Sequence, residues 1–251
     1  MAGKIKNAGT AGEGPGADLI NRGGETADSL ISYYLSEETA LREISYLTVR
    51  DFAESRMTEK KSVFIASMAH VTTEAEAQAF VGKIRAEYPD ARHNVYAYSL
   101  YNGGVPVRRF SDDGEPKGTA GMPVLDAIEK AGVTDAAVVV TRYFGGILLG
   151  ASGLTRAYSN SATDVIRESG TVKMVMARKF VLSFGYEMYG KLNMLLDDRK
   201  IIKEPPVFGS DVTLTVAVPE ADAGRLIRDI NDATSALCHI VPGEKGFCNI
   251  E

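Results

Sequence analysis

Hydrophobic positions along the middle of the chain change repeatedly between two periods, which predicts a folded region of mixed strands and helices. Apolar runs rich in β-branched and aromatic residues predict strands, whereas apolar positions three and four residues apart predict helices. The predicted strands are residues 62–69, 94–101, 105–110 and 136–141, and the predicted helices are 73–87, 119–131 and 154–168. Asn102-Gly103-Gly104 separates the second strand from the third and favours a hairpin turn between them.

A second series of apolar segments begins after Gly170 and predicts another domain. We expect strands at 180–186, 201–207, 212–218 and from 239, and helices at 189–198 and 221–233. This βαββαβ order is that of a ferredoxin-like domain. The chain as a whole is therefore predicted to be α+β, with the boundary between its two domains at 172–177.

The first part of the chain has a different composition. Residues 1–24 contain seven glycines and almost no large apolar side chains, so this segment cannot bury enough surface to offset the entropy of ordering it. Residues 26–44 show a helical pattern. We expect residues 1–45 to form a disordered or partly helical extension, followed by domains at 46–172 and 173–251.

Composition excludes several functional classes. The 251 residues carry a net charge of −5, so the molecule is not a polycation, and any basic surface must be local. No apolar run approaches the roughly 20 residues needed to span a bilayer, so no membrane partner is expected. Two cysteines outside a CxxC pair and three scattered histidines argue against a metal site, and we expect no cofactor and a cytoplasmic location.

Residues 135–158, DAAVVVTRYFGGILLGASGLTRAY, combine a strand, a glycine-rich turn and a helix. Backbone amides at such a helix N-terminus are suited to binding an anion. Gly145 and Gly150 have nearly the spacing of a P-loop, but Ala151 stands where a P-loop requires lysine, so an ATPase or GTPase is excluded.

Charged and aromatic residues flank this turn. Arg142 ends the strand, where we expect it at the exposed rim of the sheet, and Tyr143 is suited either to stacking on a base or to packing under the loop. The region 92–156 has a net charge of +1 and is the only part of the chain that is not net acidic, which favours an anionic partner. The predicted anion- or nucleic-acid-binding residues are Lys117, Arg142, Tyr143, Gly145, Gly146, Gly150, Gly153 and Arg156.

Residues 111–121, SDDGEPKGTAG, contain three closely spaced carboxylates and allow two interpretations. Asp112 and Asp113, with His93, are candidates for catalytic acids and bases. Alternatively, the segment is a tight turn in which Asp side chains cap backbone amides and Thr119 caps the following helix. Spacing alone favours the turn.

Three segments together resemble the YigZ/IMPACT family: HNVYAY at 93–98, SDDGEPKGTAG at 111–121 and VTRYFGGILLGASGLTRAY at 140–158. The resemblance extends from about Tyr46 to the C-terminus. It implies a first domain similar to domain IV of elongation factor G, an α/β sandwich of the type found in the second domain of ribosomal protein S5. It also implies a ferredoxin-like second domain similar to domain V of that factor.

The resemblance also bears on function. Eukaryotic members of this family are regulators of translation that act on a stress kinase pathway through a partner protein. The leading hypothesis is therefore a non-enzymatic, translation-associated regulator that binds RNA, the ribosome or a translation factor. The alternative is a hydrolase or phosphate-ester-processing enzyme with a cleft built from the three motifs and His93, Asp112 and Asp113 as catalytic candidates.

We expect no ATP hydrolysis above background, because Ala151 replaces the P-loop lysine and no Walker B aspartate is evident. Phosphate release from ATP by the purified chain measures this. Steady turnover that is abolished by Gly150→Val would contradict the prediction.

Overall fold

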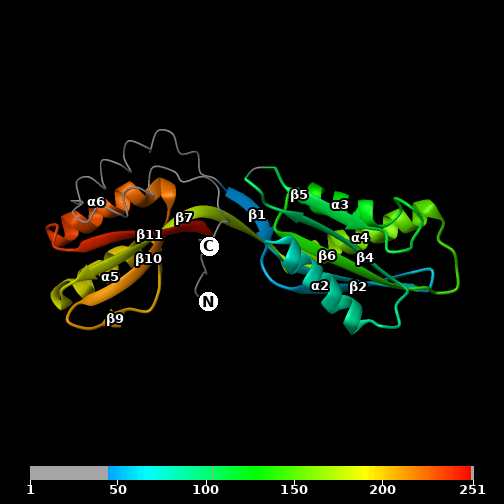
Figure 1. The fold of residues 1–251 in the computed structure, drawn as a ribbon, viewed down its shortest axis with the longest axis horizontal. Coiled ribbons are helices and arrows are strands. Elements are labelled where there is room, and N and C mark those ends of the chain that lie inside the picture. Colours follow the sequence, from blue (N-terminus) through cyan, green and yellow to red (C-terminus); the bar gives the residue numbers. More distant parts are fainter. Residues whose placement is uncertain (1–44, 104, 250–251) are drawn as a thin grey trace. The chain divides into compact units, whose positions relative to one another are not determined.

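The computed structural model describes residues 45–103 and 105–249, and the expectations for residues 1–44 lie outside these ranges. The described chain divides into two compact units, one formed by Tyr46–Lys173 and the other containing residues 174–249 (Figure 1). Each unit combines a sheet with helices, so the protein is α+β with two domains, as predicted.

The first domain is built on a five-stranded sheet in the order β2-β3-β6-β4-β5, with all neighbouring strands antiparallel. The strands are β2 (Ala53–Glu59), β3 (Ser62–His70), β6 (Ala136–Tyr143), β4 (His93–Leu100) and β5 (Val107–Ser111). The predicted hairpin is confirmed, because β4 pairs with β5 across the loop that contains Asn102 and Gly103.

Helices cover both faces of this sheet. Val138 and Val140 of β6 belong to the core beneath α3 (Gly121–Lys130) and α4 (Ala151–Ser169), whereas Val139 belongs to the core beneath α2 (Glu74–Glu87). A strand that is buried on both faces needs apolar side chains at every position, which explains the unbroken apolar run of β6.

The two long helices of this domain begin differently. Thr73 caps α2, since its Oγ1 accepts a hydrogen bond from the Glu76 amide at 3.1 Å. In contrast, α4 begins at Ala151, three residues before the predicted start, and its N-cap is Gly150 with φ of 73°. The small residues of the first turn lack the apolar spacing of the rest of the helix, so periodicity does not reveal them.

The second domain has the predicted ferredoxin-like order of elements. Its strands pair in the order β11-β7-β10-β8, all antiparallel, with β9 beside β10. Leu192 and Ile227 on the helices pack against Leu182 and Leu214 of the sheet. The elements are β7 (Thr171–Phe184), α5 (Tyr189–Asp198), β8 (Ile202–Lys203), β9 (Val207–Phe208), β10 (Val212–Pro219), α6 (Ala223–Thr234) and β11 (His239–Asn249). Strand β1 (Ser45–Val49) belongs, apart from Ser45, to the first domain.

Strand β7 is nine residues longer at its N-terminal end than the predicted strand at 180–186. It therefore includes residues 172–177, where a boundary between domains was expected. Met174 and Ala177 pair with Asn249 and Gly246 of β11, so this segment is part of a sheet and not a linker. The two compact units divide between Lys173 and Met174, which lie within β7.

Cys238 and Cys248 are both buried, and they form no disulfide with each other. Burial raises the pKa of the Cys238 thiol to about 12 and also raises the pKa of Cys248. Because the thiolate is the reactive species, we expect neither cysteine to react with a disulfide reagent at pH 8 in the native protein. Both should react at once in guanidinium chloride. Rapid labelling of the native protein would show that one of the two thiols is accessible.

Candidate functional site

Asp112 organises the turn between β5 and α3. Its Oδ2 accepts a hydrogen bond from the Gly118 amide at 2.8 Å, and its Oδ1 accepts from the amides of Ala120 at 3.1 Å and Gly121 at 2.8 Å. These amides include the first N–H groups of α3, which have no partner within the helix. Asp112 therefore caps α3 from a distance in sequence, as the turn interpretation requires.

Thr119 does not cap α3, contrary to the prediction. The N-cap residue is Ala120, and the Thr119 hydroxyl donates instead to the Pro116 carbonyl oxygen at 2.7 Å. The reason is that the Asp112 carboxylate already accepts hydrogen bonds from the amides that a Thr119 cap would have to reach.

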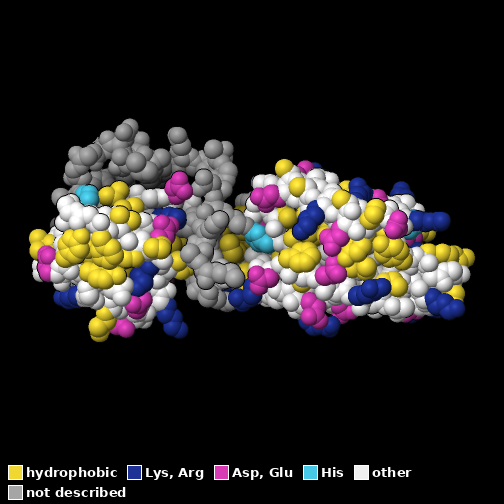
Figure 2. All heavy atoms as spheres, turned by 90° about the horizontal axis from the view of Figure 1, so that it is seen from below, with side chains coloured by type: hydrophobic (Ala, Val, Ile, Leu, Met, Phe, Trp, Pro, Cys, Tyr) yellow, Lys and Arg dark blue, Asp and Glu magenta, His cyan; other side chains and the backbone are white. Residues whose placement is uncertain are grey.

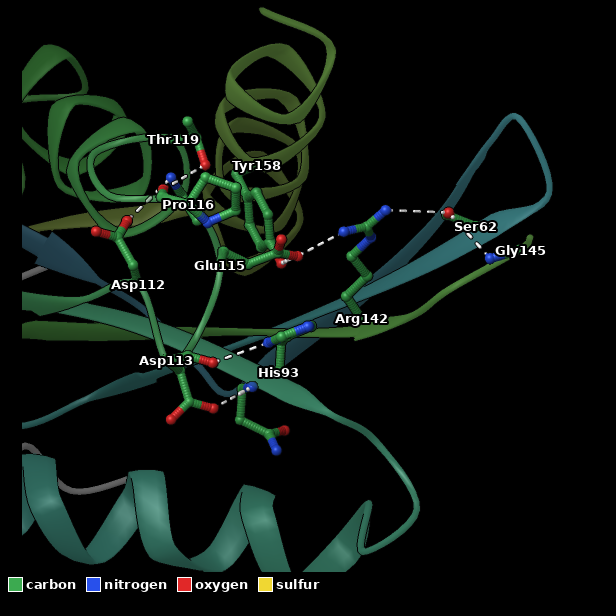
Figure 3. Close-up of polar contacts among 12 residues, drawn as sticks. Ser62, His93, Asp112, Asp113, Glu115, Pro116, Thr119, Arg142, Gly145 and Tyr158 are labelled. Atoms are coloured by element: carbon green, nitrogen blue, oxygen red, sulfur yellow. Dashed lines mark hydrogen bonds and ion pairs between the residues drawn. The ribbon is translucent and has the colours of Figure 1, made fainter. Parts of the chain in front are cut away.

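Asp113 joins the same turn to the neighbouring elements. Its Oδ2 accepts from the Asn94 amide at 2.6 Å, and its Oδ1 accepts from Arg85 Nη2 at 2.6 Å. His93 Nδ1 lies 2.9 Å from the Asp113 carbonyl oxygen (Figure 3). A carbonyl oxygen only accepts, so this contact fixes the hydrogen of neutral His93 on Nδ1.

Glu115 forms a buried ion pair with Arg142. Arg142 Nη1 donates to Glu115 Oε1 at 2.6 Å, and the Tyr158 hydroxyl of α4 donates to the same oxygen at 2.7 Å. The side chains of Arg142 and Glu115 are only 7% and 4% exposed. Burial and the neighbouring Glu115 charge raise the pKa of Tyr158, which keeps this hydroxyl protonated as a donor.

The expectation that Arg142 lies at an exposed rim is therefore wrong. The β5–α3 turn and α4 cover the end of β6, and the guanidinium also lies 5.5 Å from the Phe64 ring centroid and 5.6 Å from that of Phe144. Its charge is neutralised by a partner 27 residues away in sequence. Arg142 Nε remains buried without a hydrogen-bond partner.

Ser62 links Arg142 to the glycine-rich loop. Its hydroxyl oxygen lies 3.4 Å from Arg142 Nη2 and accepts from the Gly145 amide at 3.1 Å (Figure 3). A Cβ on Gly145 would lie 2.0 Å from the Lys61 carbonyl carbon, which no side chain can tolerate. Gly145 is therefore required because two backbones meet here.

The turn that Gly145 contacts is unusual. Lys60 and Lys61 connect paired Glu59 and Ser62, and both have positive φ, 44° and 66°. A two-residue hairpin of this kind favours Asn-Gly, and a non-glycine residue in this region costs about 1–2 kcal/mol. The lysine pair is visible in the sequence just before the first predicted strand, but its conformation is not.

The remaining predicted residues do not join this network. Gly146 and Gly150 adopt positive φ in the loop, and Gly153 lies in the first turn of α4. Lys117 and Arg156 are exposed, and within residues 45–103 and 105–249 no ion pair or hydrogen bond connects either side chain to Arg142. The predicted single patch of Lys117, Arg142 and Arg156 is therefore not formed, because Arg142 is buried.

The described residues show neither a metal-binding cluster nor a membrane-spanning helix. They contain no group of three or more His, Cys, Asp or Glu side chains that could hold a metal ion. None of the helices in that part of the chain is both long and apolar enough to cross a membrane.

Comparison with known proteins matches both domains. The Impact N-terminal domain model matches residues 60–166, which include β3, β4, β5 and β6 of the five-stranded sheet and the network around Arg142. A domain of unknown function, DUF1949, matches residues 182–236 in the ferredoxin-like domain. The chain is thus a two-domain protein of the Impact type.

Individual relatives extend the match over most of the chain. IMPACT family member YvyE of Bacillus subtilis is 34% identical over 200 residues, which cover 80% of this chain and 92% of the relative. IMPACT family member YigZ of Escherichia coli is 38% identical over 179 residues, with 69% and 85% covered. The chain belongs to the IMPACT family, as its motifs predicted.

A eukaryotic relative and a solved structure also match parts of this chain. Protein IMPACT of Bos taurus is 31% identical over 116 residues, which cover 45% of this chain and 36% of that protein. The crystal structure of a hypothetical protein aligns with a TM-score of 0.53 at 33% identity, covering 81% of this chain and 99% of its own.

Arg142→Ala should lower the free energy of unfolding of the first domain by about 3–5 kcal/mol, because it leaves the Glu115 carboxylate buried without its counterion. Arg156→Ala is the matched control, since an exposed arginine contributes about 0.5 kcal/mol or less. Urea unfolding followed by circular dichroism measures both. Equal, small changes in the two variants would contradict the assignment of Arg142 to a structural ion pair.

Proposed function

We propose that this chain is a non-enzymatic protein that acts in translation by binding the ribosome through its RNA. Membership of the IMPACT family supports the connection with translation. Eukaryotic members of the family that the motifs resemble are regulators of translation. A cytoplasmic location, where ribosomes work, is part of this proposal.

The non-enzymatic part of the proposal rests on one observation: the carboxylates of the SDDGEPKGTAG motif make hydrogen bonds within the fold. Asp112 accepts hydrogen bonds from three backbone amides, and Glu115 accepts from Arg142 and Tyr158. A general base must instead reach a substrate proton with a free lone pair. This arrangement favours a structural role for SDDGEPKGTAG over catalysis.

The hydrolase alternative receives less support from the same geometry. Asp113 is engaged by Asn94 and Arg85, and His93 Nδ1 contacts the Asp113 carbonyl oxygen. Ser62, whose hydroxyl oxygen lies 3.4 Å from Arg142 Nη2, is fully buried and accepts from the Gly145 amide. No nucleophile with a neighbouring free base is found among the described motif residues.

Co-sedimentation of the full chain with purified bacterial ribosomes tests the proposal. Few phosphate contacts are available on an acidic protein, so we expect association at about 50 mM salt and release at about 200 mM. Ribosomes treated with ribonuclease should no longer retain the chain. Absence of association at both salt concentrations would reject ribosome binding, and steady hydrolysis of a phosphate ester that needs His93 would favour the enzyme.

A further inference from the structure

Several turns of the first domain meet at one edge of its sheet. The pairs Glu59 with Ser62, Val63 with Tyr143, and His93 with Arg142 place the β2–β3 turn, the loop after β6 and the start of β4 side by side. In Figure 1 this edge lies at the right of the domain, where the blue turn and the yellow-green loop project. We call it the turn edge.

Exposed cations outnumber exposed carboxylates at the turn edge. Lys60 and Lys61 form the β2–β3 turn, and Arg92 directly precedes β4. The exposed acids beside them in sequence are Glu59 and Asp90. The nearby carboxylates of the β5–α3 turn are engaged by amides or by Arg85 and Arg142, so they offset little of this charge.

Large apolar side chains are exposed at the same edge. Phe144 is 51% exposed and Leu148 is 84% exposed, although both are large enough to be buried in a core. Figure 2 shows hydrophobic side chains together with Lys and Arg side chains at this end of the domain. The Phe144 ring lies 5.6 Å from the Arg142 guanidinium, which supports the ring from one side.

The positions of these groups are fixed by the fold. Gly145 lies against the Lys61 backbone and donates to Ser62, so the preceding residue, Phe144, is held at the same edge as the turn formed by Lys60 and Lys61. Lys60 and Lys61 occupy positive-φ positions that Asn and Gly would occupy with less strain. Strained residues of this kind concentrate at functional sites.

We propose that the turn edge binds single-stranded RNA, with phosphates at Lys60, Lys61 and Arg92 and a base stacked on Phe144. Cations beside an exposed aromatic ring are the chemistry of such sites, in which stacking tolerates any base. The inference rests on the proposed function and assigns a different surface from the buried Arg142. An acidic protein surface is the competing occupant, and the experiment separates the two.

The lysine turn allows a variant that removes charge without weakening the fold. Lys60→Asn with Lys61→Gly gives the sequence that this turn favours, so the protein should remain folded. The control is Lys191→Gln with Lys200→Gly, which removes two exposed lysines from the second domain, Lys200 also having positive φ of 55°. Both variants change the net charge equally.

Fluorescence anisotropy of a labelled oligouridylate, titrated with each protein at several salt concentrations, measures the binding constant K and its dependence on salt. For the turn variant we expect weaker binding and a slope of log K against log salt that is less negative by about 1.4, since each phosphate contact with a single strand contributes about 0.7. The control should keep the wild-type slope. Equal slopes for wild type and turn variant would overturn the proposal.

Phe144→Leu tests the stacked base separately. Loss of stacking should weaken RNA binding about 5-fold or more without changing the salt slope. Phe52→Leu is the control, because Phe52 is 55% exposed and precedes the other end of β2. Equal effects of these two substitutions would reject the stacking role.

The outcomes also separate this inference from the proposed function. If wild-type protein associates with ribosomes and both lysine variants bind RNA alike, the turn edge is the wrong surface and ribosome binding stands. If the turn variant loses ribosomes while no form binds oligouridylate, the occupant is a protein, which overturns the RNA assignment. If wild-type protein binds neither ribosomes nor RNA, the proposed function itself fails.

Discussion

The buried ion pair between Arg142 and Glu115 is the interaction on which the first domain depends. Taking two charges out of water costs several kcal/mol per ion, and only close geometry with further hydrogen bonds offsets that cost. Here Tyr158 and Ser62 supply these contacts, so the pair connects four separate segments: β3, the β5–α3 turn, β6 and α4. Polar residues that look catalytic in sequence thus hold the domain together.

This ion pair also determines where an external partner can be contacted. An arginine neutralised by a buried carboxylate offers little charge to solvent, and its Nη atoms are directed to Glu115 and Ser62 (Figure 3). The carboxylate of Asp112 is similarly occupied, because it accepts hydrogen bonds from the amides at the start of α3. What remains accessible is the periphery that these contacts position, namely the lysine turn and the loop that follows β6.

Local signals in the sequence predicted much of the fold. The apolar run of β6 and the hairpin at Asn102 both depend on neighbouring residues, and both are found. The burial of Arg142 could not be predicted in this way, because its partner lies in another segment and only the tertiary fold brings the two together. The early part of β7 was missed for a related reason, since its pairing with β11 compensates for a mixed pattern of apolar and charged residues.

The turn formed by Lys60 and Lys61 shows that backbone geometry can indicate a role that the sequence alone does not. Two lysines before a strand normally indicate a solvated surface, and their charge alone would carry no argument. In the structure each occupies a left-handed conformation that costs about 1–2 kcal/mol relative to glycine, and Gly145 contacts the second of them through its backbone. Relief of this strain by Asn-Gly would stabilise the hairpin but remove both charges, so stability and a cationic edge oppose each other at this turn. A fold that keeps the strained lysines is consistent with a use for their charge outside the domain.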